Sequence, residues 1–156
     1  MAQESVHMND TLYILNGPNL NLLGVREPHL SGGTTLAQVQ QLCERVTAEL
    51  GYRCDFRQSN HEGVLVDWVQ EARENAAAVV INPAGLSFRS IPLLDALKTL
   101  DQPLAEVHIT NIHRRDPLYQ HSLISLAATG VICGFGPFGY ELAIRAVAQR
   151  LALAVA

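Results

Sequence analysis

The residues most suited to chemistry are a carboxylate and an imidazole within one short apolar segment. Glu106 and His108 lie in residues 104–109, which read Leu-Ala-Glu-Val-His-Ile, and Thr110 follows directly. Side chains along a strand alternate between its two faces, so these three residues are expected on the same face. A charge and an imidazole in an apolar strand cost free energy unless they are paired or catalytic. The pattern therefore predicts a general acid or base at this position.

Polar loops follow the apolar runs and offer further candidates. Asn16, Asn19 and Asn21 surround a Gly-Pro pair; they fit either a plain turn or a site where amides bind an oxyanion or a water molecule. Residues 26–33 are polar and end in two glycines, which is typical of a mobile flap. Arg26 in that flap is either a solvated surface charge or a cation that closes over an anion. Both alternatives stay open at this point.

Two other loops are less specific. Residues 82–87 begin Asn-Pro-Ala-Gly, and their small side chains let backbone amides approach a ligand closely. Residues 58–63 are more simply explained as the start of a helix, which Ser59 or Asn60 would cap, with Glu62 at its positive end.

Two apparent motifs are set aside. Residues 134–139 match G-x-G-x-x-G, but a dinucleotide site needs a further strand and an acidic residue after it, so a tight strand-to-helix turn is the better interpretation. His108, His113 and His121 match no zinc spacing, and no thiolate lies near them in the sequence. The sequence therefore predicts neither a metal nor a cofactor.

The elements that position these residues alternate between short apolar runs and helical patterns. Residues 36–50 carry apolar side chains at helical spacing, begin with a capping box at Thr35 and Gln38, and end before Gly51. Strand–helix alternation predicts an α/β fold, a flavodoxin-like five-stranded parallel sheet with helices on both faces. Such sheets bind ligands at the carboxyl ends of their strands. The five predicted strands are 11–15, 52–56, 77–81, 104–109 and 130–133; the other helices are centred on 65–72, 90–100 and 140–151.

Length and composition narrow the class of protein. The chain has 156 residues and a mass of 17.0 kDa, which fits one domain, residues 11–156, after a loose extension of residues 1–10. A net charge of −4 lacks the basic surface that nucleic acids require. No apolar run reaches the ~20 residues of a membrane span, and the first residues show no signal-peptide core. Three widely spaced cysteines favour a reducing cytoplasm over a disulfide framework.

Several motifs, taken in order, resemble the type II 3-dehydroquinate dehydratases. They are ILNGPNLNLLG, REP, GGTTL, QSNHEG, INPAG, EVHITNIH and GFGPFGY, and they span nearly the whole chain. The resemblance implies a flavodoxin-like subunit in a dodecamer built from trimers, working in the shikimate pathway of aromatic amino acid biosynthesis. It also implies a cofactor-free, metal-free lyase that converts 3-dehydroquinate to 3-dehydroshikimate through an enolate.

The same resemblance implies a role for each candidate residue. Arg26 lowers the pKa of a neighbouring base, Asn16 holds the water that stabilises the enolate, and His108, oriented by Glu106, protonates the departing hydroxyl. The remaining positions bind a small carboxylic acid, with Asp95 reaching in from a neighbouring subunit; they are Asn82, Gly85, Phe88, Asp95, Ile109, Thr110 and Tyr119.

Three of these positions depart from the family pattern. Ser31 stands where the family has its proton-abstracting tyrosine, and an alcohol is far less acidic than a phenol of pKa near 10. Phe88 and Tyr119 stand where the family has a substrate-binding histidine and arginine. A diverged enzyme acting on another carboxylic acid, or a ligand-binding homologue without catalysis, is therefore an alternative. His29 or Tyr119 is a possible substitute base.

Overall fold

The computed structural model describes residues 9–155, including their side chains except those of Ser31 and Val155. Residues 1–8 of the predicted N-terminal extension lie outside the described residues. Within the described part, the Asp10 carbonyl already accepts a hydrogen bond from the Arg53 backbone N–H (2.8 Å), at the start of the sheet.

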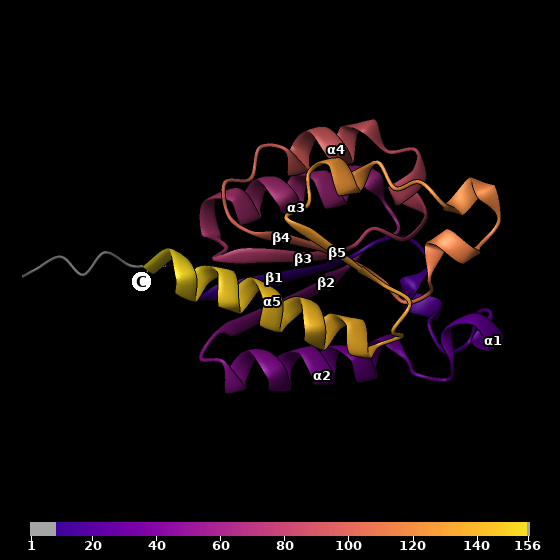
Figure 1. Cartoon of the computed structure of the whole chain (residues 1–156), viewed down its shortest axis with the longest axis horizontal. Coiled ribbons are helices and arrows are strands. Elements are labelled where there is room, and N and C mark those ends of the chain that lie inside the picture. Colours follow the sequence, from indigo (N-terminus) through magenta and orange to yellow (C-terminus); the bar gives the residue numbers. More distant parts are fainter. Residues whose placement is uncertain (1–8, 156) are drawn as a thin grey trace, which may run out of the picture.

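Five parallel strands form one sheet in the order β2-β1-β3-β4-β5, which confirms the predicted flavodoxin-like architecture (Figure 1). Each prediction from an apolar run is correct to within two residues at either end. β2 shows the largest shift, because its polar end, Arg57 and Gln58, still pairs with β1. The strands are β1 (Thr11–Asn16), β2 (Arg53–Gln58), β3 (Ala78–Asn82), β4 (Leu104–His108) and β5 (Gly130–Cys133).

Two layers of helices bury the two faces of the sheet, as Figure 1 shows. α2 (Leu36–Glu49) and α5 (Phe138–Val155) cover one face, while α3 (Glu62–Asn75) and α4 (Ile91–Leu97) cover the other. Successive strand residues alternate between the two cores: Leu12 and Ile14 pack beneath α2 and α5, and Tyr13 and Leu15 pack beneath α3 and α4.

Short helices gather at the carboxyl ends of the strands, where the fold class predicts a ligand site. α1 (Pro28–Ser31) lies in the predicted flap. The 3-10 helices at this end span Leu20–Leu22, Ala84–Phe88, Ile112–Arg114 and Pro117–Tyr119, and a further one, Ile124–Leu126, packs against α4 before β5.

The predicted start of α3 is wrong by one or two residues. His61, rather than Ser59 or Asn60, occupies the N-cap position, and the Ser59 hydroxyl instead accepts a hydrogen bond from the His61 backbone N–H (3.0 Å). Asn60 is engaged elsewhere, because its carbonyl oxygen accepts from the Asn19 backbone N–H (2.9 Å). Glu62 does stand in the first turn, as predicted.

The capping box of α2 forms as predicted and can be tested. The Thr35 hydroxyl accepts from the Gln38 N–H (3.3 Å), and the Gln38 side chain accepts from the Thr35 N–H (2.9 Å). We expect Thr35→Ala to lower the free energy of unfolding by about 1 kcal/mol. The Gln38 N–H loses its hydroxyl acceptor, and the reciprocal bond of the capping box is weakened. Urea denaturation measures this loss. The exposed Gln41→Ala on the same helix should change stability by less than about 0.5 kcal/mol, and an equal loss would contradict the prediction.

Candidate active site

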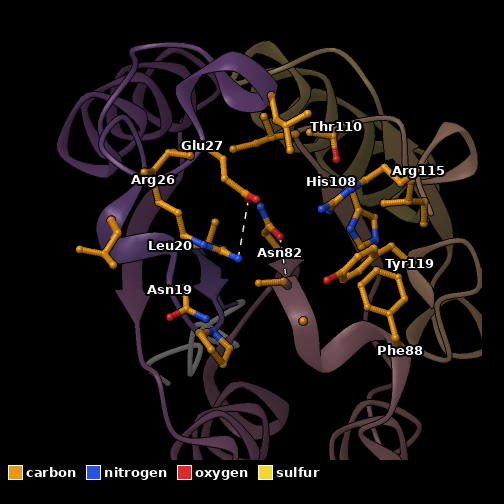
Figure 2. Close-up of a pocket in the computed structure, with 18 residues that line it drawn as sticks. Asn19, Leu20, Arg26, Glu27, Asn82, Phe88, His108, Thr110, Arg115 and Tyr119 are labelled. Atoms are coloured by element: carbon orange, nitrogen blue, oxygen red, sulfur yellow. Dashed lines mark hydrogen bonds and ion pairs between the residues drawn. The ribbon is translucent and has the colours of Figure 1, made fainter. Parts of the chain in front are cut away.

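A pocket of about 270 Å³ opens at the carboxyl ends of β1, β3 and β4. In Figure 2, Asn19, Leu20, Arg26 and Glu27 lie on one side of it, Phe88, His108, Arg115 and Tyr119 lie opposite, and Asn82 stands between them. Its remaining lining residues are mostly apolar: Pro18, Leu22, Leu23, Leu30, Ala84, Gly85, Ile109, Thr110 and Ile112.

Glu106 and His108 form a buried pair behind one wall of the pocket. They share a face of β4, as the alternation predicts, and the Nε2 atom of His108 bonds to the Oε2 atom of Glu106. The other carboxylate oxygen accepts from the Ser125 hydroxyl (2.8 Å). Glu106 is fully buried and His108 is 5% exposed, yet His108 lines the pocket. The pair can thus hold the imidazole in one orientation for proton transfer.

Burial raises the pKa of the Glu106 carboxyl, but the bond from His108, its charge and the seryl hydroxyl outweigh burial and lower the pKa below its ordinary value near 4.5. A carboxyl with a lowered folded-state pKa stabilises the fold while ionised. That contribution is complete above the ordinary value and is lost as the pH falls through the folded-state pKa.

We therefore expect the stability advantage of the wild type over Glu106→Gln to stay constant from about pH 7 to about pH 5 and to shrink as the pH falls further, through the lowered folded-state pKa of Glu106. Urea denaturation at several pH values measures the difference in the free energy of unfolding. Asp67→Asn, which changes an exposed carboxylate on α3, should show a small difference at every pH. An advantage over Glu106→Gln that stays constant with pH would contradict the expectation.

Asn16 does not reach the pocket; Asn19 does. Asn16 is fully buried on the α2/α5 face, where its side chain donates to the Arg57 carbonyl (3.0 Å) and accepts from the Tyr140 hydroxyl (2.7 Å). The physical reason is strand alternation, which turns the last residue of β1 toward the core. Asn19 follows Pro18 and has a left-handed backbone (φ 70°), which turns it out of the strand direction. Only its place after the turn could have distinguished it in the sequence.

Backbone strain also collects at the pocket. Among the described residues, the non-glycine positions with positive φ are Asn19 (70°), Glu27 (47°) and Ala84 (51°), and all three line the pocket. Such conformations cost free energy and are characteristic of functional sites. They mark this pocket independently of the residues' chemistry.

The charged and aromatic walls include residues that the sequence did not single out. Arg26 pairs with Glu27 (3.7 Å), and the Arg115 guanidinium lies 4.2 Å from the centre of the Tyr119 ring. Phe88 meets Tyr119 edge to face, with ring centres 5.5 Å apart. Arg115 and Glu27 were missed, although each stands in a loop that follows a strand end. The pocket therefore combines cations with an aromatic wall.

Most of the other predicted site residues line the pocket, and two do not. Gly85, Ile109 and Thr110 line the pocket, together with Arg26, Asn82, Phe88, His108 and Tyr119. Asp95 is exposed on α4 and does not line the pocket of its own chain. Ser31 ends α1 beside the pocket residue Leu30, and its side chain is outside the described part of the structure.

Metal-ligand groups and membrane-spanning helices are both absent from the described residues. Between residues 9 and 155, no three His, Cys, Asp or Glu side chains form a group that could hold a metal ion. None of the helices described there combines the length and apolar character needed to cross a membrane.

Comparison with known proteins supports the interpretation of the motifs. Residues 10–148 match the family described as dehydroquinase class II. The chain is 52% identical over 140 residues to 3-dehydroquinate dehydratase 1 of Agrobacterium fabrum, covering 90% of this chain and 97% of that protein. It is 56% identical over 135 residues to 3-dehydroquinate dehydratase of Caulobacter vibrioides, covering 86% and 92%. These names favour a dehydratase over the alternatives of another substrate or of binding without catalysis.

The fold agrees with the sequence comparison. The crystal structure of the type II dehydroquinase from Propionibacterium acnes superposes with a TM-score of 0.87 at 40% identity, covering 92% of this chain and 99% of that one. Since the family match extends over almost all of the sheet and its covering helices, we conclude that this chain belongs to the class II dehydroquinases.

Proposed function

We propose that this chain eliminates water from 3-dehydroquinate to give 3-dehydroshikimate, using its own side chains and backbone amides. The observation that carries the proposal is the buried Glu106–His108 pair at the wall of the pocket. Relatives at about half identity bear the name of this activity, which supports the same assignment here.

The reaction needs a base, a site that stabilises an enolate and an acid. The base removes a proton alpha to the ketone, and the C–H electrons form the enolate. The enolate then collapses and expels the beta hydroxyl, which leaves as water after it takes a proton from His108. Glu106 orients the imidazole and stabilises its charged form. Asn19, rather than Asn16, is positioned to hold a water molecule at the enolate oxygen, because it lines the pocket.

The substrate's carboxylate fits the end of the pocket formed by Ile109 and Thr110, whose backbone amides follow β4. Asn82 and Gly85 line the adjoining side and suit the ring hydroxyls. Arg26 and Arg115 supply positive charge around the pocket, which favours an anionic substrate.

We assign the base to Tyr119. Ser31, at the position of the family's tyrosine, carries an alcohol that is too weak an acid to form the required anion near neutral pH. Of the two substitutes suggested by the sequence, Tyr119 lines the pocket and His29 does not. The Arg115 guanidinium lies over the Tyr119 ring, 4.2 Å from its centre, so a cation stands directly beside the proposed base.

Turnover of 3-dehydroquinate, followed by the ultraviolet absorbance of the enone product, tests the proposal. We expect the wild type to turn over at ordinary enzyme rates and Tyr119→Phe to lose at least about 100-fold in kcat. Ser31→Tyr, assayed beside them, reports whether a flap phenol improves the site. A wild type without activity beside an active Ser31→Tyr would contradict the proposal and favour a diverged substrate.

We also propose that the chain assembles into a homo-oligomer, a dodecamer built from trimers, in which Asp95 binds a substrate hydroxyl in a neighbouring subunit's pocket. Asp95 is exposed and stands one turn from Ile91, which is 53% exposed on the same helix. An exposed apolar residue beside an exposed carboxylate suits a subunit contact. The free thiols of Cys43, Cys54 and Cys133 suit a reducing cytoplasm, where we place the enzyme.

Light scattering should give the mass of twelve 17.0-kDa chains. Asp95→Asn should raise KM for 3-dehydroquinate about 10-fold without changing that mass, because a charged hydrogen bond to the substrate is lost. A monomer with full activity would contradict both parts of the proposal.

A further inference from the structure

We propose that Tyr140 is a positioning residue for the pocket, and that the glycine-rich turn before it serves to place its hydroxyl beneath Asn82. Tyr140 lies in the first turn of α5, directly after the G-x-G-x-x-G segment of residues 134–139. The proposed reaction gives that segment no role of its own. The inference rests on the proposed function only for its kinetic test.

The sheet register brings two asparagines to one place beneath the pocket. Asn16 and Asn82 are direct partners at the carboxyl ends of the neighbouring strands β1 and β3. Both belong to the alternating set that faces α2 and α5, so their amides point to the same side of the sheet. Tyr140, fully buried on that side, contacts both of them.

The hydrogen bonds run in one direction through this cluster. The Tyr140 hydroxyl donates to Oδ1 of Asn16 (2.7 Å), so it can only accept from Nδ2 of Asn82 (2.9 Å). Asn16 in turn donates to the Arg57 carbonyl (3.0 Å), and Oδ1 of Asn82 accepts from the Ala84 N–H (3.2 Å). The Tyr140 hydroxyl links the two amides, and together with the Arg57 carbonyl and the Ala84 N–H it fixes their orientations. One Nδ2 proton of Asn82 remains for a ligand oxygen in the pocket.

The glycine-rich turn brings α5 close enough for this contact. A Cβ atom on Gly139 would lie 3.4 Å from Cγ1 of Val107 and 3.6 Å from Cγ2 of Ile132, so the backbone of α5 packs directly against the sheet at this residue. The Gly134 N–H donates to the His108 carbonyl (3.2 Å), and the Gly136 N–H donates to the Ile109 carbonyl (3.0 Å). The turn thus ties the start of α5 to the strand end that carries His108.

The hydroxyl of Tyr140 also stays protonated, which the arrangement requires. Burial raises the pKa of this phenol well above its ordinary value. Tyr140 therefore keeps its proton for Asn16 over the range in which the protein is folded, and it acts as a fixed donor rather than as an acid or base.

Tyr140→Phe removes one oxygen atom and preserves the volume of the core. We expect kcat/KM for 3-dehydroquinate to fall about 10- to 100-fold, because the Asn82 amide is no longer held in one orientation. In an Asn82→Ala background the same change should cost less than about 2-fold, since Tyr140 acts through Asn82. Tyr52→Phe, an equivalent change at a tyrosine beside the α2 core, should leave kcat/KM unchanged. An equal loss in both backgrounds, or no loss in either, would overturn the proposal.

A second measurement needs no turnover. In ¹⁵N-labelled protein, exchange of the Asn82 side-chain amide protons with water should be at least about 10-fold faster in Tyr140→Phe than in the wild type, because the buried bond is lost. Unchanged exchange would overturn the positioning role even in a variant that folds normally. A wild type that neither turns over nor binds 3-dehydroquinate, yet shows the faster exchange in Tyr140→Phe, would refute the proposed function and retain this inference.

Discussion

Replacing His108 with asparagine is expected to lower kcat for the dehydration of 3-dehydroquinate by about 10²- to 10⁴-fold. His108 lines the pocket and is held by Glu106, so it is the group placed to protonate the departing hydroxyl. Without it the hydroxyl must leave as hydroxide, which is a far poorer leaving group. Steady-state turnover measures kcat, and KM should change much less because the carboxylate-binding backbone is untouched.

A matched control is available on the same side of the molecule. His113 is exposed, and its backbone N–H, rather than its imidazole, is held by the Asn111 side chain (3.1 Å). His113→Asn should therefore keep the wild-type kcat. The thermal midpoint of each variant separates lost chemistry from lost folding. A folded His108→Asn variant with kcat within about 3-fold of the wild type would remove His108 from the mechanism.

The largest expected effect on stability is at Gly17, immediately after β1. A Cβ atom there would lie 2.4 Å from the carbonyl oxygen of Pro83 and 2.8 Å from its carbonyl carbon. Both atoms are backbone, so no side-chain rotation can relieve the clash, and the hydrogen bond from the Gly17 N–H to the Asn82 carbonyl (2.8 Å) must stretch. We expect Gly17→Ala to lower the free energy of unfolding by about 2–4 kcal/mol.

Urea denaturation of Gly17→Ala measures that loss, and turnover should fall with it because Asn82 lines the pocket. Gly63→Ala provides the opposite case. Gly63 lies in α3, and a Cβ atom there meets nothing within 4 Å. Alanine at this helical site should stabilise the protein by up to about 1 kcal/mol. Similar stability in the two variants would contradict the prediction, because it would mean that the close approach of Gly17 to Pro83 does not limit the side chain at residue 17.

The sequence by itself determined the sheet and its helices. Four- to six-residue apolar runs marked the five strands, and the capping box at Thr35 and Gln38 located the start of α2. These features are set by contacts between near neighbours and by side-chain period, which are readable along the chain. The pairing of Glu106 with His108 belongs to the same class, because two residues two apart on a strand share a face.

Which asparagine faces the ligand depended on more than local pattern. Asn16 ends β1 and Asn19 stands in the turn that follows, and both carry the same amide. Strand alternation buries Asn16, whereas Asn19, with its left-handed backbone, lines the pocket. Backbone direction after a strand is set by what packs against the loop, here the bond from the Asn19 N–H to Asn60 across the sheet end. The resemblance gave the water-holding role to Asn16, which the structure buries, while Asn19 lines the pocket.

The tertiary structure alone decided the contacts between residues far apart in the chain. Tyr140 meets Asn16 across 124 positions of sequence and Asn82 across 58. Asp95, which the resemblance assigns to the pocket of a neighbouring subunit, does not line the pocket of its own chain. Period and composition report which face of an element a side chain occupies. They carry no information on which distant element covers that face. Only the packing of α5 and the loops against the sheet determines which residues meet there.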